Sequence, residues 1–326
     1  MKWIGRRQSV GIAKEATRGV NVQPTFFLNV NSFDFFDVVQ KARSETSFGR
    51  ITGGAIAPVS LRHAEGDMEV ELGSESFGLI LLALLGTVSS TGPADAVAYT
   101  HSYSLQNDNA HDSLTIHTID PIGQFAFELG MINSLTLNIT PDGIVTYTVN
   151  FMSKTAVDSG GVTASYTAEN KFIGRNLAFK IAATTASLTA ASNIKLKSLT
   201  LNFEKNTEVN QVMSTIQPDD IVNKLFSITG SVELDYEDRT YIDYMKDGSY
   251  KAVRIELEAT SVLTGAATTK AKFTLDLSKV DFENFSPDVS MNDIVKQSFD
   301  ITALYDVGGN DNLINACTLV NLTANY

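Results

Sequence analysis

The chain has 326 residues, of which 43% are hydrophobic and 19% charged, so it is long enough for two folded domains and too apolar for a disordered polymer. Its 37 acidic and 25 basic residues give a formal charge of -12, the wrong sign for a protein that grips nucleic acid through the phosphates. A single cysteine, Cys317, excludes an internal disulfide. Polar residues follow the basic N-terminus, so no secretion signal is expected.

Alternating strands dominate the first half of the sequence. The stretches "DMEVEL", "SLTLNI" and "IVTYTVNF" predict strands with one dry face and one wet face. Their expected core positions are Met68, Val70, Leu72, Leu135, Leu137, Ile139, Val145, Tyr147, Val149 and Phe151. Between them, "FGLILLALLG" has about half of the ~20 apolar residues needed to cross a bilayer. It predicts a buried helix that begins near Ser74 and ends at Gly86.

The second half repeats this alternation. In "FSITGSVELDYE", "AVRIELEA" and "KFTLDL", every second residue is expected in a core. These residues are Phe226, Ile228, Gly230, Val232, Leu234, Tyr236, Val253, Ile255, Leu257, Phe273, Leu275 and Leu277. A weaker helix is predicted in "DRTYIDYMKDG", where Asp238 could cap the start and Gly248 could end the last turn.

Matches between the halves favour an internal duplication. "GDMEVEL" from Gly66 and "GSVELDY" from Gly230 share one pattern. A predicted helix follows each copy, then a strand ("YTHSYSL" in the first half and "YKAVRIEL" in the second), and then a closing strand. "SLTLN" occurs at both 134–138 and 198–202, which similar strand environments would explain. We expect a first module with its N-terminal arm at 1–154, a connection at 155–192 and a second module at 193–326. Chance likeness among strands rich in Val, Thr and Leu is the alternative.

No catalytic or metal-binding pattern is complete. The histidines His111 and His117 lack zinc-ligand spacing, and "GSESFG" fails the nucleophile-elbow pattern, so helix capping is the better interpretation there. Alternating acids such as Glu69 with Glu71 could act as a general acid pair, but a solvated strand face explains them more simply. We therefore expect no enzyme activity, no cofactor and no metal.

An ordered series of motifs resembles one known family. "RRQSVGIAKEATRGVNVQPTFFLNVNSFDF", "RSETSFGRI", "AEGDMEVEL" and "GSESFGLILLALLG" follow one another over about the first hundred residues. In this order they are similar to the tail tube proteins of tailed bacteriophages. Each motif alone is weakly specific, and the second half fits the family by pattern only.

The resemblance implies a mainly β fold of tandem tail-tube-type β-sandwich or barrel modules, each with one flanking helix. It also implies rings of sixfold appearance that stack into a tube for viral DNA. Two modules per chain favour three copies per ring over six. The implied partners are the chain itself, a tape-measure protein, tail-end proteins and, transiently and without sequence preference, DNA. The implied location is the virion, after assembly in the host cytoplasm, without membrane insertion.

Alternation also suggests which acidic residues could line the bore of such a tube. Two equivalent strands place acids on their wet faces: Asp67, Glu69 and Glu71 on one, and Glu233, Asp235 and Glu237 on the other. If this face lines the bore, DNA meets like charge and slides without sticking. The alternative is an outer face in contact with solvent.

Long polar excursions between strands are candidates for contacts between stacked rings. They are the N-terminal arm, the loop around 40–50 and the segment "EKNTEVNQVMSTIQ". The residues expected to make these contacts are Arg6, Arg7, Lys14, Glu15, Arg18, Lys41, Arg43, Glu45, Glu208 and Gln211. Deleting residues 4–14 should then leave rings or protomers that do not stack.

A carbohydrate- or receptor-binding β-sandwich of a fibre or adhesin is the competing function. Such a site needs clustered exposed aromatic side chains. The only tryptophan, Trp3, is near the N-terminus, and most Phe and Tyr residues fall on expected core positions.

Overall fold

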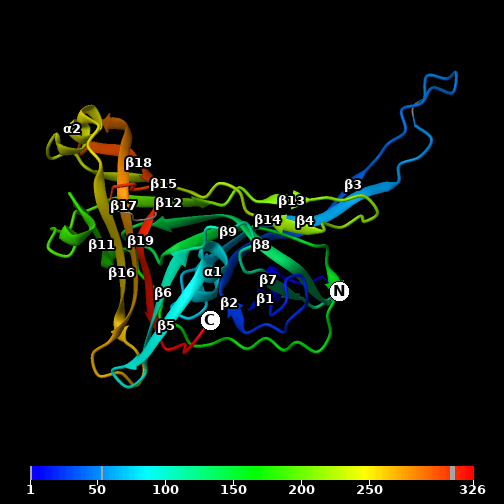
Figure 1. The fold of residues 1–326 in the computed structure, drawn as a ribbon, viewed down its shortest axis with the longest axis horizontal. Helices are drawn as coiled ribbons and strands as arrows, with labels where there is room; N and C mark the ends of the chain where they lie inside the picture. Colours follow the sequence, from blue (N-terminus) through cyan, green and yellow to red (C-terminus); the bar gives the residue numbers. More distant parts are fainter. Residues whose placement is uncertain (1, 53, 309–312) are drawn as a thin grey trace.

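The computed structural model describes residues 2–52, 54–308 and 313–326 (Figure 1). Within these ranges the chain forms nineteen β-strands and two α-helices, most of them in one antiparallel network. The expectation of a mainly β fold with few helices is confirmed.

The first half contains β1 (Ser9–Lys14), β2 (Phe26–Leu28), β3 (Val30–Lys41), β4 (Val59–Glu71), α1 (Phe77–Leu85), β5 (Gly86–Ala94), β6 (Ala98–Leu105), β7 (Leu114–Ile119), β8 (Gln124–Ile139), β9 (Thr146–Ser153) and β10 (Val157–Asp158). The second contains β11 (Leu177–Ala182), β12 (Ser198–Glu204), β13 (Glu208–Asn210), β14 (Asp220–Val222), β15 (Ser227–Asp235), α2 (Thr240–Asp247), β16 (Lys251–Val262), β17 (Lys270–Asp288), β18 (Lys296–Leu304) and β19 (Ile314–Asn321). Short 3-10 turns lie at Gly5–Arg7, Gly174–Asn176 and Thr185–Ser187.

Eight strands form one long sheet in the order β3-β4-β9-β8-β12-β15-β18-β17. All neighbouring pairs are antiparallel. The first four strands come from the first half of the chain and the last four from the second, and β8 and β12 join the two sets. We call this array the long sheet.

Two further layers complete the molecule. Residues 124–130 of β8 leave the long sheet to pair with β7, which pairs with β1. In the same way, residues 270–280 of β17 pair with β16, which pairs with β11. Each half is thus a two-layer sandwich in which one long strand belongs to both layers.

The two halves follow the same strand order. In each, the second strand of the long-sheet set (β4 or β15) leads into a helix, and the fourth (β8 or β17) extends into the second layer. By pairing, the counterpart of β16 is β7 and not β6, so the expected equivalence of "YTHSYSL" with "YKAVRIEL" is wrong. The β5–β6 hairpin is an extra element of the first half.

Glycines occupy matching places in the two sets. Gly66 of β4 lies between Phe35 and Phe151, and Gly230 of β15 lies between Leu201 and Ile301. A Cβ at Gly66 would lie 1.8 Å from a backbone oxygen of β3, and one at Gly230 would lie 2.8 Å from a backbone oxygen of β12. Close approach of the neighbouring strand therefore explains both glycines.

The repeated "SLTLN" segments pair with each other. On the core side, Leu137 lies opposite Leu201, Leu199 opposite Ile139 and Leu135 opposite Phe203. On the other side, Thr136 lies opposite Asn202, with their side-chain oxygens 2.9 Å apart. The sequence repeat therefore marks the junction between the halves.

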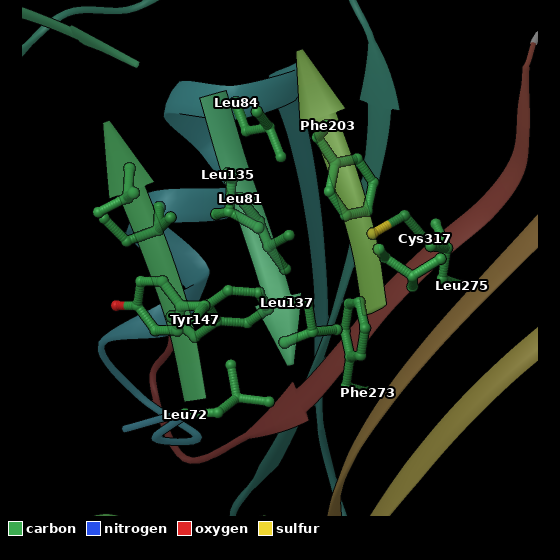
Figure 2. Packing of buried hydrophobic residues seen from close by; sticks show 14 of the residues in the cluster. Leu72, Leu81, Leu84, Leu135, Leu137, Tyr147, Phe203, Phe273, Leu275 and Cys317 are labelled. Carbon is green, nitrogen blue, oxygen red and sulfur yellow. The ribbon is translucent and has the colours of Figure 1, made fainter. Parts of the chain in front are cut away.

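One hydrophobic core serves both halves, and α1 lies at its centre (Figure 2). All nine residues of α1 are buried. Figure 2 shows Leu81 and Leu84 facing Leu135 and Phe203 of the long sheet, with Leu275 and Cys317 of the second layer close by. A helix that is apolar on every side needs this complete enclosure, so the predicted buried helix is confirmed.

The helix termini agree with the sequence in part. Gly86 and Gly248 end α1 and α2 in the left-handed conformation, with φ of 95° and 60°. The Asp238 carboxylate accepts the Thr240 N–H at 2.9 Å, but the N-cap position of α2 is Arg239, so Asp238 lies one residue before the cap site. Helix α1, however, begins at Phe77, because the Ser74 hydroxyl is engaged by the backbone N–H of Asn170 at 3.1 Å.

The β5–β6 hairpin connects the first half to the second layer of the other half. Strand β6 pairs with β19. At the hairpin tip, the Asp95 carboxylate accepts the backbone N–H groups of Ala267, Thr268 and Thr269 at 2.9–3.1 Å. These hydrogen bonds hold the pKa of Asp95 well below its usual range, and the one from Thr268 contributes most.

Residues after β19 fold back over the start of α1. The buried Glu75 carboxylate accepts the Thr323 N–H at 3.1 Å and its hydroxyl at 2.7 Å. The Asn321 amide donates to Ser74 O at 2.8 Å, and the Tyr326 hydroxyl donates to Glu75 O at 2.6 Å. The two halves are therefore interlocked.

His101 makes this interlock sensitive to pH. Its Nε2 lies 3.0 Å from Asn321 Oδ1 and 2.9 Å from Thr323 O, and burial lowers its pKa. The unfolded chain then binds a proton more readily than the folded one as pH falls below about 6.5, so stability falls in that direction. We expect the melting temperature to decrease between pH 7.5 and pH 5.5.

In His101→Gln this decrease should be smaller, because the amide can donate from the same place but does not titrate. Thermal melts of both proteins at the two pH values measure the difference. An equal decrease would show that His101 does not contribute.

Candidate functional site on the polar face of the long sheet

The face of the long sheet that points away from the core is lined by small polar and acidic side chains. One register row crosses all eight strands, with one residue from each: Ser32, Glu69, Thr148, Thr136, Asn202, Thr229, Thr302 and Asp281. A neighbouring row contains Glu71, Thr146, Asn138, Thr200, Ser231, Asp300 and Glu283. We call this surface the polar face.

Five of the six predicted lining residues belong to paired strands of the polar face. Asp67 and Glu69 come from β4, and Glu233 and Asp235 from β15. Glu71 ends β4, where Lys171 lies 3.5 Å away. Glu237 lies after the end of β15, in the segment that leads to α2, and is exposed.

Three of these six acids pair with a lysine: Glu71 with Lys171, Asp235 with Lys197 at 3.3 Å, and Glu233 with Lys296. Asp67 accepts from the Asn150 amide at 2.7 Å. Glu233 pairs with Lys296 at 3.2 Å, a half-exposed contact that contributes little to stability. The face as a whole therefore presents negative charge and hydroxyl groups to whatever lies in front of it.

Sequence reasoning missed much of this face. The Ser, Thr and Asn residues between the acids, and the acids Asp34, Asp281, Glu283 and Asp300, were not singled out. Alternation shows which side of each strand is wet, but only the pairing order shows that these wet sides form one surface.

The predicted contact loops lie at one end of the long sheet. Lys41, at the end of β3, together with Arg43 and Glu45 belongs to an exposed hairpin that extends far from the body (Figure 1). We call residues 36–62 the arm. The loop between β12 and β15 lies beside its base, since the Arg62 N–H donates to Ile216 O at 2.8 Å. Glu208 and Gln211 belong to this second loop, where Glu208 pairs with Lys224 at 2.9 Å.

The residues near the N-terminus that were predicted to contact another ring differ from one another in exposure. Arg6 and Arg7 are exposed in the first 3-10 turn. Lys14 pairs with Asp112 at 2.7 Å. Glu15 does not lie on the surface as predicted: it is only 4% exposed, and its carboxylate accepts the Leu129 N–H at 2.8 Å and the Thr115 hydroxyl at 3.1 Å.

Arg18 is also engaged within the chain. Its guanidinium bonds to Asp220 at 2.8 Å and to the backbone oxygens of His111 and Ile221. It therefore ties the N-terminal segment to the loop between β12 and β15. Strand β1 lies between β2 and β7, with Val10 and Ile12 buried, so deletion of residues 4–14 would damage the fold rather than remove a free arm.

No catalytic constellation accompanies the polar face in the described ranges. No cluster of three or more His, Cys, Asp or Glu side chains there could hold a metal ion. Burial raises the pKa of the Cys317 thiol far above its usual value. No helix in the same ranges is long and apolar enough to cross a membrane.

A β-rich chain with open sheet edges, a continuous polar face and projecting loops has the features of a structural protein that assembles with itself. The sequence model of the phage tail tube protein family matches residues 5–303, nearly the whole chain. The chain belongs to this family, which implies a structural component of the virion that self-assembles into a tube. No curated protein matches it.

Proposed function

We propose that three copies of this chain form a ring, that rings stack into the tail tube, and that the polar face lines the bore through which DNA is ejected. In this proposal each chain is an internal duplication that supplies two modules. The same strand order in the two halves and their matched glycines support the duplication. Tape-measure and tail-end proteins are the proposed further partners, and the host cytoplasm is the proposed place of assembly.

The observation that carries the proposal is the pair of open edges on the long sheet. Within the described residues, β3 pairs only with β4, and residues 281–288 of β17 pair only with β18. Exposed apolar side chains accompany both edges, including Phe36 on β3, which is 59% exposed, and Val289 just after β17. An open edge with apolar neighbours is a pairing site for another chain.

The β8–β12 junction shows how such edges could join. It connects the last strand of one four-strand set to the first strand of the next, in antiparallel register. The equivalent connection between chains joins β17 of one copy to β3 of its neighbour. Three chains closed in this way leave no open edge in the long sheet.

The register across the junction also suits a closed barrel. If Gly66 and Gly230 are aligned, Glu69 corresponds to Glu233. The register row that starts at Glu69, however, crosses β15 at Thr229, four positions before Glu233. The step from the first half to the second therefore carries a stagger of four positions, and the proposed seam between chains would repeat it. Strands in a closed barrel are tilted and need such a stagger.

Engineered cysteines test the ring directly. The junction pairs Thr136 with Asn202, and their counterparts at the open edges are Ser286 and Phe36. We expect Phe36→Cys with Ser286→Cys to form disulfides between chains on mild oxidation of assembled tubes. Denaturing electrophoresis should show a ladder that stops at three chains.

Three controls test whether the interchain disulfide reports the proposed pairing of β17 with β3. Thr136→Cys with Asn202→Cys should cross-link within one chain, and each single variant should stay uncross-linked because native Cys317 is buried. Gln40→Cys with Ser286→Cys, four positions out of register, should give little product. A ladder that continues to six chains would replace the trimer by a hexamer, and absence of any interchain product would refute this seam.

A further inference from the structure

A pocket of about 390 Å³ lies where the halves meet, away from the polar face. Its wall combines Leu105, Asp108 and His111 of the first half with Lys205, Asn223 and Phe226 of the second. The pocket is at the base of the loop between β12 and β15. Nothing in the proposed ring or bore uses it.

Lys205 carries a buried amine without a carboxylate partner. The residue is 1% exposed, and its Nζ donates to Ala83 O in the last turn of α1 at 2.8 Å. This contact is favourable because the C-terminal end of a helix carries partial negative charge. It uses one of the three ammonium donors, and among the described residues no acid lies within ion-pair distance of Lys205.

Acids at the pocket wall and in the segments beside it are already engaged. Asp112 pairs with Lys14 at 2.7 Å, and Asp220 with Arg18 at 2.8 Å. Asp108, on the pocket wall, accepts the Gln106 amide at 2.6 Å and the Ala110 N–H at 2.9 Å. Burial, with a smaller contribution from Arg18, lowers the pKa of Lys205 to about 7.

The side-chain amide of Asn223 is a second, independent indication that the pocket binds a ligand. It is 8% exposed, and both polar atoms of its side-chain amide are buried without a hydrogen-bond partner in the described chain. A buried amide in this state costs about 1–3 kcal/mol unless something else bonds to it. Its backbone N–H is held by Asn109 O at 3.1 Å, which keeps the residue on the pocket wall.

We propose that this pocket binds an oxyanion, a carboxylate or a phosphate, between the Lys205 ammonium and the Asn223 amide. Acceptor oxygens of the anion meet the ammonium and the amide N–H, and a protonated phosphate can also donate to Asn223 Oδ1. The anion is either free in solution or an acidic side chain of a neighbouring copy. Bound there, it would join the loop between β12 and β15 to the first half.

Thermal melts in phosphate test the site on protomers purified before assembly. Sodium phosphate and sodium chloride are compared at matched ionic strength at pH 7. The melting temperature should rise with the logarithm of the phosphate concentration, as expected of a ligand that binds only the folded state. Phosphate also stabilises proteins by exclusion from their surfaces, and that general effect should be equal in all variants.

Lys205→Met should remove the specific part of the phosphate response, whereas Lys180→Met, which changes charge by the same amount on β11, should keep it. Asn223→Ala provides a second probe because its side-chain amide makes no hydrogen bond that the substitution would remove, and it should weaken the response several-fold. An equal rise in melting temperature for wild type and Lys205→Met would overturn the proposal.

Assembled tubes distinguish the two sources of the anion. If an acidic side chain of a neighbouring copy fills the pocket, phosphate should no longer raise the melting temperature of tubes, and Lys205→Met tubes should dissociate at lower salt. If the anion is free, tubes should respond to phosphate as protomers do. These results do not depend on ring size, so failure of the trimer proposal would leave them unaffected.

Discussion

Replacing Glu69 and Glu233 together by lysine is expected to slow DNA ejection several-fold at low salt while tubes still assemble. Both residues lie on the polar face, on matching strands β4 and β15. Each lysine offers the phosphates a contact that releases counterions, which DNA must break again as it moves. The acids that occupy these positions offer no such contact.

The effect should depend on ionic strength. Because counterion release weakens as salt rises, ejection from the variant should approach the wild-type rate at high salt. Assembly should survive, since the pair lost between Glu233 and Lys296 is half-exposed. Time-resolved DNA release from purified virions gives the rates, and electron microscopy gives tube length.

A matched control has the same change of charge elsewhere. Asp243→Lys with Asp247→Lys places two lysines at exposed positions of α2, outside the strands of the polar face. This variant should eject DNA like wild type. If the two double lysine variants eject at the same rate, the polar face does not line the bore.

Shortening the arm is expected to stop stacking and leave rings. Residues 43–57 would be replaced by a short Gly-Ser turn, which keeps the pairing of β3 with β4 from Phe33 to Gln40. The deleted segment exposes Phe48, Ile51 and Ile56 to solvent, and exposed apolar side chains grouped on one loop are typical of a contact surface. Negative-stain microscopy should therefore show rings or protomers in place of tubes.

A second variant separates loop length from apolar contact. Phe48→Ser with Ile51→Ser and Ile56→Ser keeps the arm but removes its apolar side chains, and it should also fail to stack. Melting temperatures close to wild type would show that neither change harms the fold. Tubes of normal length from either variant would remove the arm from the stacking interface.

Local patterns predicted the strands because burial follows the two-residue period of a half-wet sheet. Met68, Val70, Ile228 and Val232 are all buried as expected. Tyr236 is 37% exposed because β15 ends at Asp235, before the alternation does. The sequence pattern could not indicate where the sheet would stop supporting it.

Strand β17 departs from the two-sided pattern for a different reason. Phe273, Leu275 and Leu277 are buried as predicted, but so is Asp276 on the side expected to be wet. Arg254 lies opposite it on β16 and bonds both carboxylate oxygens at 2.7 Å. A buried acid of this kind depends on a partner 22 positions away, and alternation carries no information about such a partner.

The candidate site was predictable one strand at a time. The acids of β4 and β15 were recognised, but their union in one face depends on the β8–β12 junction, which no local pattern specifies. Glu15 shows the opposite error. A charged residue in a polar stretch suggested surface contact, whereas neighbouring hydroxyls and a backbone N–H draw it into the interior.

The interlock between the halves has a consequence for biosynthesis. Glu75 is translated 248 positions before Thr323, the residue whose N–H and hydroxyl satisfy its buried carboxylate. A first half alone therefore lacks the partners of this buried carboxylate until the end of the chain has been synthesised. Completion of the folded protomer thus depends on the last residues of the chain to be synthesised.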